Sequence, residues 1–269
     1  METNYKKIIE SNEIPENYKY YWNYQFKLGL EAIHPYLVKN KSFETNYSVI
    51  EIGSAEGGVL HALGLKGAST LIGTDIAKNR IEIGLKISNL LNIKTNYYIH
   101  NILTDEIPEN WIQKFDLVLL RDVIEHLEDT ETTLKNIKKL LKPNGKIFIT
   151  FPPYYSPFGG HQHTLGLKIA KIPYLHLLPT QAFKTIIKKG RKNDIDEVLR
   201  LRNIKLTPKK LETTALKQNY HIIKKDFYLL RPVFKIKFGL PSIKLTKLTF
   251  LPLIKNFLSL EASYILQLK

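Results

Sequence analysis

The chain has 269 residues, of which 40 are Lys or Arg, 25 are Asp or Glu, 43% are apolar and none is cysteine. The lack of cysteine excludes a disulfide framework, a thiolate metal site and a cysteine nucleophile, and the apolar content is sufficient for a sizeable core. The formal charge of +15 lies in one part, because residues 1–150 have a balance of −1 and residues 151–269 a balance of +16. Such a basic region could face nucleic acid, anionic lipid or a phosphorylated substrate.

The N-terminal segment, residues 1–44, is predicted to form helices that cover the core. It lacks the apolar stretch of a signal peptide, and no part of the chain approaches the ~18 apolar residues that span a bilayer, so we expect a cytoplasmic protein. Aromatic residues gather around Trp22. These rings could close over the bound ligands, with Trp22 touching the substrate, or they could simply pack in the core.

Residues 45–152 alternate short β-branched runs with segments of helical spacing, which is typical of βαβ units around a parallel sheet. The last helical segment ends in Lys142-Pro143-Asn144-Gly145, a strong stop-and-turn signal. The pattern predicts strands at Ser48–Ile52, Thr70–Thr74, Asn96–His100, Phe115–Leu120 and Lys146–Phe151, and helices at Gly58–Leu65, Lys78–Leu91 and Thr130–Leu141.

The second part of the chain loses this rhythm. Residues 153–206 are punctuated by Pro and Gly and are interpreted as an inserted lid, whereas residues 207–269 are expected to complete the core. In this last part we expect a helix from Pro208 to about Asn219, a strand at His221–Leu230, an irregular basic segment over Pro232–Asn256 and a final strand at Ser259–Leu268.

A glycine-rich turn follows the first predicted strand, in Glu51-Ile52-Gly53-Ser54-Ala55-Glu56-Gly57-Gly58. Glycines there let the backbone approach a ligand closely, and the next helix offers free N–H groups, although such a turn can also be purely structural. Asp75 ends the second strand, where a carboxylate can accept hydrogen bonds from both ribose hydroxyls of a nucleoside. The combination indicates a nucleoside-binding crevice. Ala55 in the middle position and the acidic Glu51 suit an ammonium better than a diphosphate.

At these motifs the chain resembles the class I S-adenosylmethionine-dependent methyltransferases, particularly the small-molecule branch with the ubiquinone-biosynthesis methyltransferases. The resemblance covers residues 45–152. It includes three further motifs, which are Asn101-Ile102, Phe115-Asp116-Leu117-Val118 leading to Asp122-Val123-Ile124-Glu125-His126-Leu127, and Leu140-Leu141-Lys142-Pro143-Asn144-Gly145-Lys146. It implies a Rossmann-like α/β fold, a three-layer sandwich around a seven-stranded, mostly parallel sheet, with N-terminal helices and the inserted lid.

The resemblance also implies roles for single residues in binding S-adenosylmethionine. Glu51 and the backbone of Gly53, Ser54, Ala55 and Gly57 would hold its methionine end. Asp75 would bind the ribose and Ile76 would pack on the adenine. Asn101, where the family commonly has Asp, would accept a bond from the adenine amino group beside Ile102. Arg121 and Asp122 would border the methionine and the acceptor pocket.

Methyl transfer to a hydroxyl needs a base, and histidine suits this task because its usual pKa lies near neutral pH. The candidates are His161 and His163, which follow the fifth strand, and His126, which could instead cap a helix. Tyr154 and Tyr155 lie in the same Pro-rich loop and are predicted to wall the acceptor site. No complete metal-ligand set is evident from the spacing, so we predict no metal.

Lysines alternate with large apolar residues in Leu165–Leu178 and Phe234–Lys255, and only 4 of the 22 basic residues after residue 150 are Arg. This composition favours an anionic membrane surface over nucleic acid, although the lysines could also form an ordinary solvated face. We therefore expect methylation of an oxygen on a small apolar, lipid-linked or sugar-linked acceptor, by a cytoplasmic protein that could sit on the inner membrane face. The alternatives are an RNA or protein methyltransferase and a non-catalytic nucleoside-binding partner protein.

Overall fold

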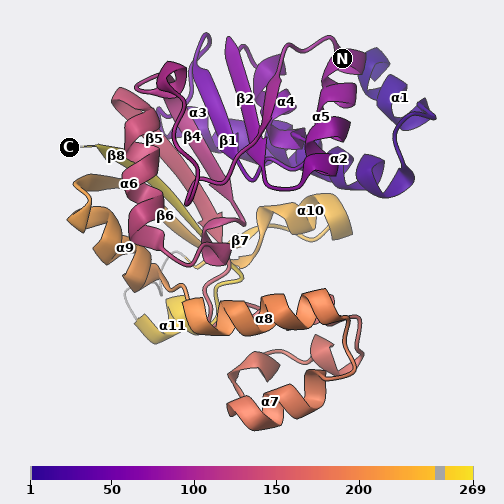
Figure 1. Ribbon diagram of the computed structural model, residues 1–269, viewed down its shortest axis with the longest axis vertical. Coiled ribbons are helices and arrows are strands. Elements are labelled where there is room, and N and C mark those ends of the chain that lie inside the picture. The colour runs from indigo at the N-terminus through magenta and orange to yellow at the C-terminus, as the bar shows by residue number, and fades with distance from the viewer. Residues whose placement is uncertain (1, 246–251, 269) are drawn as a thin grey trace.

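The computed structural model describes residues 2–245 and 252–268 (Figure 1). Within this part, the chain forms an eight-stranded sheet in the order β3-β2-β1-β4-β5-β8-β6-β7. The first five strands are parallel, and β8 pairs antiparallel with both β5 and β6. The strands are β1 (Ser48–Ile52), β2 (Thr70–Asp75), β3 (Asn96–Ile99), β4 (Phe115–Arg121), β5 (Leu141–Phe151), β6 (Tyr220–Leu230), β7 (Ile243–Lys244) and β8 (Glu261–Leu268).

Helices cover both faces of this sheet, so the predicted α/β sandwich is confirmed. Alternate residues of a strand face opposite sides. In β1, Ile50 packs in a core cluster with α6 (Thr130–Leu140) and α9 (Pro208–Lys217), whereas Val49 packs in a second cluster with α4 (Gly58–Leu65). The remaining helix of this half, α5 (Lys78–Leu91), packs against β2 and β3.

The N-terminal segment contains α1 (Glu2–Glu10), α2 (Glu16–Leu28), a π-helical turn (Gly29–Ile33) and α3 (His34–Lys39). The indole of Trp22 is fully buried, stacks 4.7 Å from Phe26, and donates a hydrogen bond of 3.1 Å from Nε1 to Nδ1 of His61. Trp22 is therefore a core residue in this structure. α2 packs closely on α4, because a Cβ at Gly58 would lie 2.8 Å from the Trp22 carbonyl oxygen.

The segment between β5 and α9 is more regular than the sequence predicts. It contains three 3-10 turns, α7 (Thr180–Ile187) and α8 (Lys192–Ile204), and Figure 1 shows both helices beyond one end of the sheet. Its apolar side chains form a separate small core, so this lid segment is folded in its own right. The members of that core are Leu165, Ala170, Leu175, Phe183, Ile187 and Val198.

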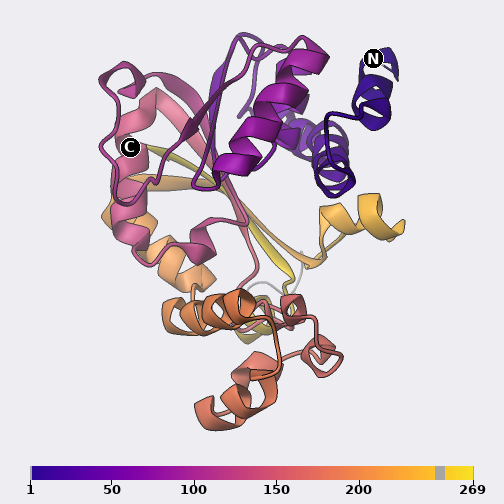
Figure 2. The same cartoon turned by 45° about the vertical axis from the view of Figure 1, so that its right-hand side comes forward.

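The C-terminal region differs from the prediction in two ways. The segment expected to be irregular contains α10 (Pro232–Phe238), β7 and α11 (Pro252–Phe257), and residues 246–251 of the predicted basic segment lie outside the described residues. The sheet has eight strands instead of seven, because Ile243 and Lys244 pair with the end of β6. α10 contacts α2, and Figure 2 shows it beside the N-terminal helices. Among the described residues, no helix is long and apolar enough to cross a membrane.

Candidate active site

The turn between β1 and α4 has the backbone conformation of a ligand-binding loop. Gly53 (φ +67°), Ala55 (φ 49°) and Gly57 (φ +74°) all lie in the left-handed region. The carboxylate of Asp75 holds the turn by accepting hydrogen bonds from the Ala55 N–H at 3.0 Å and the Ala77 N–H at 2.9 Å. Each carboxylate oxygen keeps a further lone pair, so Asp75 can still accept bonds from a ligand.

A small hollow lies beside this turn, with Glu51 and Arg121 in its wall. It measures about 20 Å³ and is also lined by Ser54, Tyr21 and Gln25. Oε2 of Glu51 and both Nε and Nη1 of Arg121 are buried with no hydrogen-bond partner among the described residues. Burial raises the pKa of Glu51 to about 7, and the nearby charge of Arg121 opposes this shift. Nε of Arg121 lies 3.6 Å from Oε1 of Glu51, so the two charges already face each other. Their atoms that lack hydrogen bonds fit a ligand that carries both an ammonium and a carboxylate, such as the methionine end of S-adenosylmethionine.

The hollow has room for about one water molecule, so the cover helix α2 must give way when a larger ligand binds. Gln25 accepts a hydrogen bond from Nη2 of Arg121. This N–H group is therefore not available to a ligand while Gln25 stays in place. Tyr21 lines the same hollow from α2. These two side chains are the parts of the cover that must move.

The nucleoside end of the predicted site is more open. Ile76 is 72% exposed at the end of β2, where an adenine could lie on it. Oδ1 of Asn101 already accepts a hydrogen bond of 3.0 Å from the Leu103 N–H, so the oxygen that was expected to meet the adenine is engaged in a local turn. The side chain of Ile102 is buried in the core, which leaves only its backbone available to a ligand.

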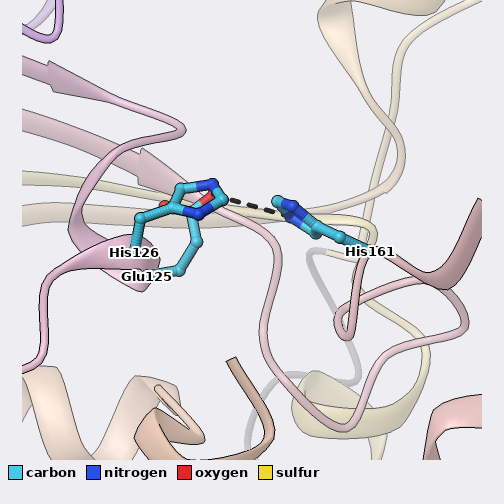
Figure 3. A group of neighbouring side chains, drawn as sticks. All are labelled: Glu125, His126 and His161. Atoms are coloured by element: carbon cyan, nitrogen blue, oxygen red, sulfur yellow. Dashed lines mark ion pairs between the residues drawn. The ribbon is translucent and has the colours of Figure 1, made fainter. Parts of the chain in front are cut away.

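A second group of polar side chains lies at the end of β4 and in the loop after β5 (Figure 3). Oε1 of Glu125 lies 3.8 Å from Nε2 of His126 and 3.8 Å from Nε2 of His161. Both oxygens of Glu125 are buried without a hydrogen-bond partner among the described residues. Glu197 of α8 pairs with Nδ1 of His126, so the lid segment contributes to this group. His161 and the nearby Asp122 both have left-handed backbone conformations. This conformation is strained for residues other than glycine, and such strain is typical of functional sites.

The environment gives the two histidines different protonation states. Burial, together with the charge of His126, lowers the pKa of His161 to about 3. For His126, burial is outweighed by the hydrogen bond with Glu197 and the charge of Glu125, so its pKa is raised. Burial also raises the pKa of Glu125 to about 8. His161 is therefore the neutral imidazole of this group and His126 the one that tends to carry a proton.

The same three side chains could also hold a divalent cation. Their ligand atoms lie within 4.8 Å of one another, and Glu197 would orient His126 from behind. No metal was predicted, because no complete set of ligands was evident from the spacing. The fold brings His161 next to both Glu125 and His126, which the spacing along the chain does not show.

Two larger cavities lie beside these groups. The first, of about 250 Å³, is lined by Arg121, Asp122 and Arg231, and the second, of about 530 Å³, is lined by Arg231, His161 and His163. We call the second one the acceptor cavity. Arg231 joins the two cavities and donates hydrogen bonds to Asp122 at 2.5 Å and to Glu261 at 3.0 Å.

This arginine network was missed by the sequence analysis. Burial alone would raise the pKa of Asp122, but Arg231 and Arg121 beside it hold the pKa below its usual value. Arg231 follows the sixth strand, more than a hundred residues from Asp122, so no local motif links the two. Arg231 lies directly after a predicted strand, at the sheet edge where the other candidate residues lie. This position is the one feature of the sequence that could have identified Arg231.

The two tyrosines predicted to wall the acceptor site do not line the two cavities described above. Tyr154 is 4% exposed and its ring packs 5.1 Å from His176, whereas Tyr155 packs on Tyr154 and on Phe257. The loop instead presents Pro152, Ser156 and Phe158 to the acceptor cavity. The loop is irregular, so the contacts of Tyr154 with His176 and of Tyr155 with Phe257 determine which of its side chains face the cavity.

Comparison with known proteins places this architecture in a family. A methyltransferase domain family matches residues 21–183, more than half of the chain. Similar proteins include the ubiquinone biosynthesis O-methyltransferases of Dictyostelium discoideum (29% identical, 43% of this chain and 40% of the relative) and Coxiella burnetii (27% identical, 55% and 65%). The matched region thus spans less than two thirds of these relatives.

Solved structures agree on the fold. A putative sarcosine dimethylglycine methyltransferase from Galdieria sulphuraria aligns with a TM-score of 0.58 at 14% identity, over 88% of this chain and 84% of that one. Phosphoethanolamine N-methyltransferase 2 of Haemonchus contortus, in complex with S-adenosyl-L-methionine, aligns with a TM-score of 0.54 at 16% identity, over 88% and 52%. The predicted resemblance is confirmed, and the chain belongs to the methyltransferase domain family, in the class of S-adenosylmethionine-dependent enzymes.

Proposed function

We propose that the chain transfers the methyl group of S-adenosylmethionine to an oxygen of a small apolar, lipid-linked or sugar-linked acceptor. The observation that carries this proposal is that Glu51 and Arg121 keep buried polar atoms without hydrogen bonds beside hollows that share lining residues. Arg121 lines the small hollow and the first cavity, and Arg231 lines the first cavity and the acceptor cavity, where His161 also lies. Relatives that are named ubiquinone biosynthesis O-methyltransferases support an oxygen acceptor.

The cofactor, when bound, supplies a methyl group activated by a positively charged sulfur. Glu51 and Arg121 would hold its amino acid end and Asp75 its ribose. In an in-line displacement, most of the rate enhancement comes from alignment of the acceptor with this methyl group.

His161 is the base in this proposal, because it lines the acceptor cavity and its neutral imidazole can accept a proton. The pKa of about 3 that burial gives it makes it a weak base, so alignment of the acceptor has to supply most of the rate enhancement. His163 lines the same cavity but its side chain is exposed, so it serves better at the entrance. His126 is paired with Glu197 and is less suited to accept a proton. Glu125 lies 3.8 Å from His161 and would stabilise the imidazolium only after losing its own proton, because burial raises the pKa of Glu125 to about 8.

The lid segment and α10 would rest on an anionic membrane if the acceptor is lipid-linked. Ile169, Ile172, Phe238 and Leu240 are large apolar side chains that are exposed among lysines. This composition suits the headgroup region of a bilayer. We expect sedimentation with anionic vesicles at moderate salt, and the same measurement with RNA tests the nucleic-acid alternative.

The test is an assay with tritium-labelled methyl donor and a panel of phenols, catechols and amines, followed by mass spectrometry of the product. We expect methyl ethers, and we expect His161→Gln to abolish them. Products methylated only on nitrogen would contradict the proposal, and a relative named phosphoethanolamine N-methyltransferase 2 makes this outcome worth checking.

A further inference from the structure

The acceptor cavity combines apolar walls with positive charge. Phe158, Val233, Phe234, Phe238 and Leu260 supply apolar surface, and Lys171, Lys237 and Arg231 supply three cations. No Asp or Glu is among the described residues that line it. A ligand in this cavity therefore meets a positive potential with no acidic side chain of the wall to balance it.

The three cations differ in what balances them. Arg231 is already paired with Asp122 and Glu261. Lys171 and Lys237 have no carboxylate within 4.0 Å among the described residues. On the same helix as Lys237, by contrast, Lys235 lies 3.7 Å from Glu31, so carboxylate partners are available nearby for lysines outside the cavity.

Lys237 is the more constrained of the two lysines. Its Nζ lies 3.7 Å from the ring centroid of Tyr24, which fixes the ammonium at the wall where α10 meets α2. Burial and the neighbouring charge of Arg231 lower its pKa. A partly desolvated ammonium next to a second cation is unfavourable by itself and is relieved when an anion binds.

We propose that the acceptor is an amphiphilic anion, whose apolar body fills the cavity and whose carboxylate or phosphate group contacts Lys237, with Lys171 at the entrance. This inference rests on the proposed function in one respect, because it takes this cavity as the place of the acceptor. Lys237 and Lys171 are then residues that determine specificity. They select the charge of the acceptor, while His161, which lines the same cavity, acts on its reacting group.

The test uses two fluorescent probes of nearly equal shape, anilinonaphthalene sulfonate and its uncharged parent N-phenylnaphthylamine, with the full chain. We expect Lys237→Gln to weaken binding of the sulfonate about tenfold, as for the loss of one charge-assisted hydrogen bond, and to leave binding of the neutral probe unchanged. The matched control Lys235→Gln, on the same helix, lines the first cavity but not the acceptor cavity and should change neither. Phe238→Ser should weaken both probes, which places them in the cavity.

Displacement of the sulfonate then distinguishes the acidic groups. Dodecanoate, dodecyl phosphate and dodecanol share one chain length, and we expect the two anions to displace the sulfonate better than the alcohol does. The anion that displaces it more strongly shows whether the cavity prefers a carboxylate or a phosphate group. Equal competition by all three, or equal effects of Lys237→Gln on both probes, would overturn the inference. Neither measurement requires methyl transfer, so failure here leaves cofactor binding, measured separately by calorimetry, as an independent test of the proposed function.

Discussion

The cofactor side and the acceptor side of this molecule are built in different ways. The cofactor side comes from neighbouring strands of the first half, where Glu51, Asp75 and Arg121 each end or closely precede the end of a strand. The acceptor side collects His161 from a loop, Glu197 from α8 and Arg231 from the start of α10. The first is close to neutral in charge and the second carries the whole positive excess. Binding of the cofactor thus depends on local motifs, whereas selection of the acceptor depends on contacts between distant segments.

The largest effect is expected from removing the arginine that joins the two cavities. Arg231→Met leaves the buried Glu261 and the half-buried Asp122 without this partner, and we expect it to cost about 3 kcal/mol of unfolding free energy. Urea denaturation measures this loss. Lys235→Met is the control, since its pair with Glu31 is exposed and should contribute less than about 1 kcal/mol. Similar losses in both variants would mean that the network has no special role.

The second largest effect is expected on kcat, from a substitution of the proposed base. His161→Gln removes the proposed base, and we expect kcat to fall by about 10²-fold or more. His163→Gln should cost much less, because its side chain is exposed at the cavity entrance. The rates are measured across pH with the acceptor identified from the panel. A kcat that is unchanged in His161→Gln would remove this residue from the mechanism.

The buried contact between His61 and Trp22 predicts how the stability of the fold depends on pH. His61 is fully buried, and burial lowers its pKa to about 3. Its Nδ1 accepts the Trp22 N–H, so the imidazole must stay neutral in the fold. Because the unfolded state binds the proton more readily, the stability from this group is complete above about pH 6.5 and is lost as pH falls toward 3.

We expect this histidine to contribute a slope of about 1.4 kcal/mol per pH unit between about pH 6 and 4. His61→Gln, which keeps an acceptor for Trp22, should remove that contribution. Denaturation of both proteins over this pH range provides the measurement, and curves that stay parallel would contradict the assignment.

The smallest effect concerns the same contact. Trp22→Phe removes the hydrogen bond to His61 but keeps an aromatic ring next to Phe26, so we expect a loss of about 1 kcal/mol in unfolding free energy. Acceptor kinetics should not change, because Trp22 is buried in the core. A change in KM with unchanged stability would return Trp22 to the substrate site.

The sequence predicted the cofactor side far better than the acceptor side, and the reason is physical. The five parallel strands and the turn at Gly53 have local signals, namely β-branched runs, glycines and strand-end carboxylates. The short β7, the folded lid segment and the network of Arg231 have none, because contacts between distant segments determine them. Tyr154 was assigned to the right loop but lies against His176 instead of the cavity, since periodicity alone cannot place an irregular loop.

Calorimetry with S-adenosylmethionine tests most directly whether the two sides are separate. Asp75→Ala should weaken cofactor binding about tenfold to hundredfold, because it removes the ribose acceptor and the hydrogen bonds that hold the turn at Ala55. His161→Ala, on the acceptor side, should bind the cofactor as tightly as the unaltered chain. No binding by the unaltered chain, or equal losses in the two variants, would contradict the account.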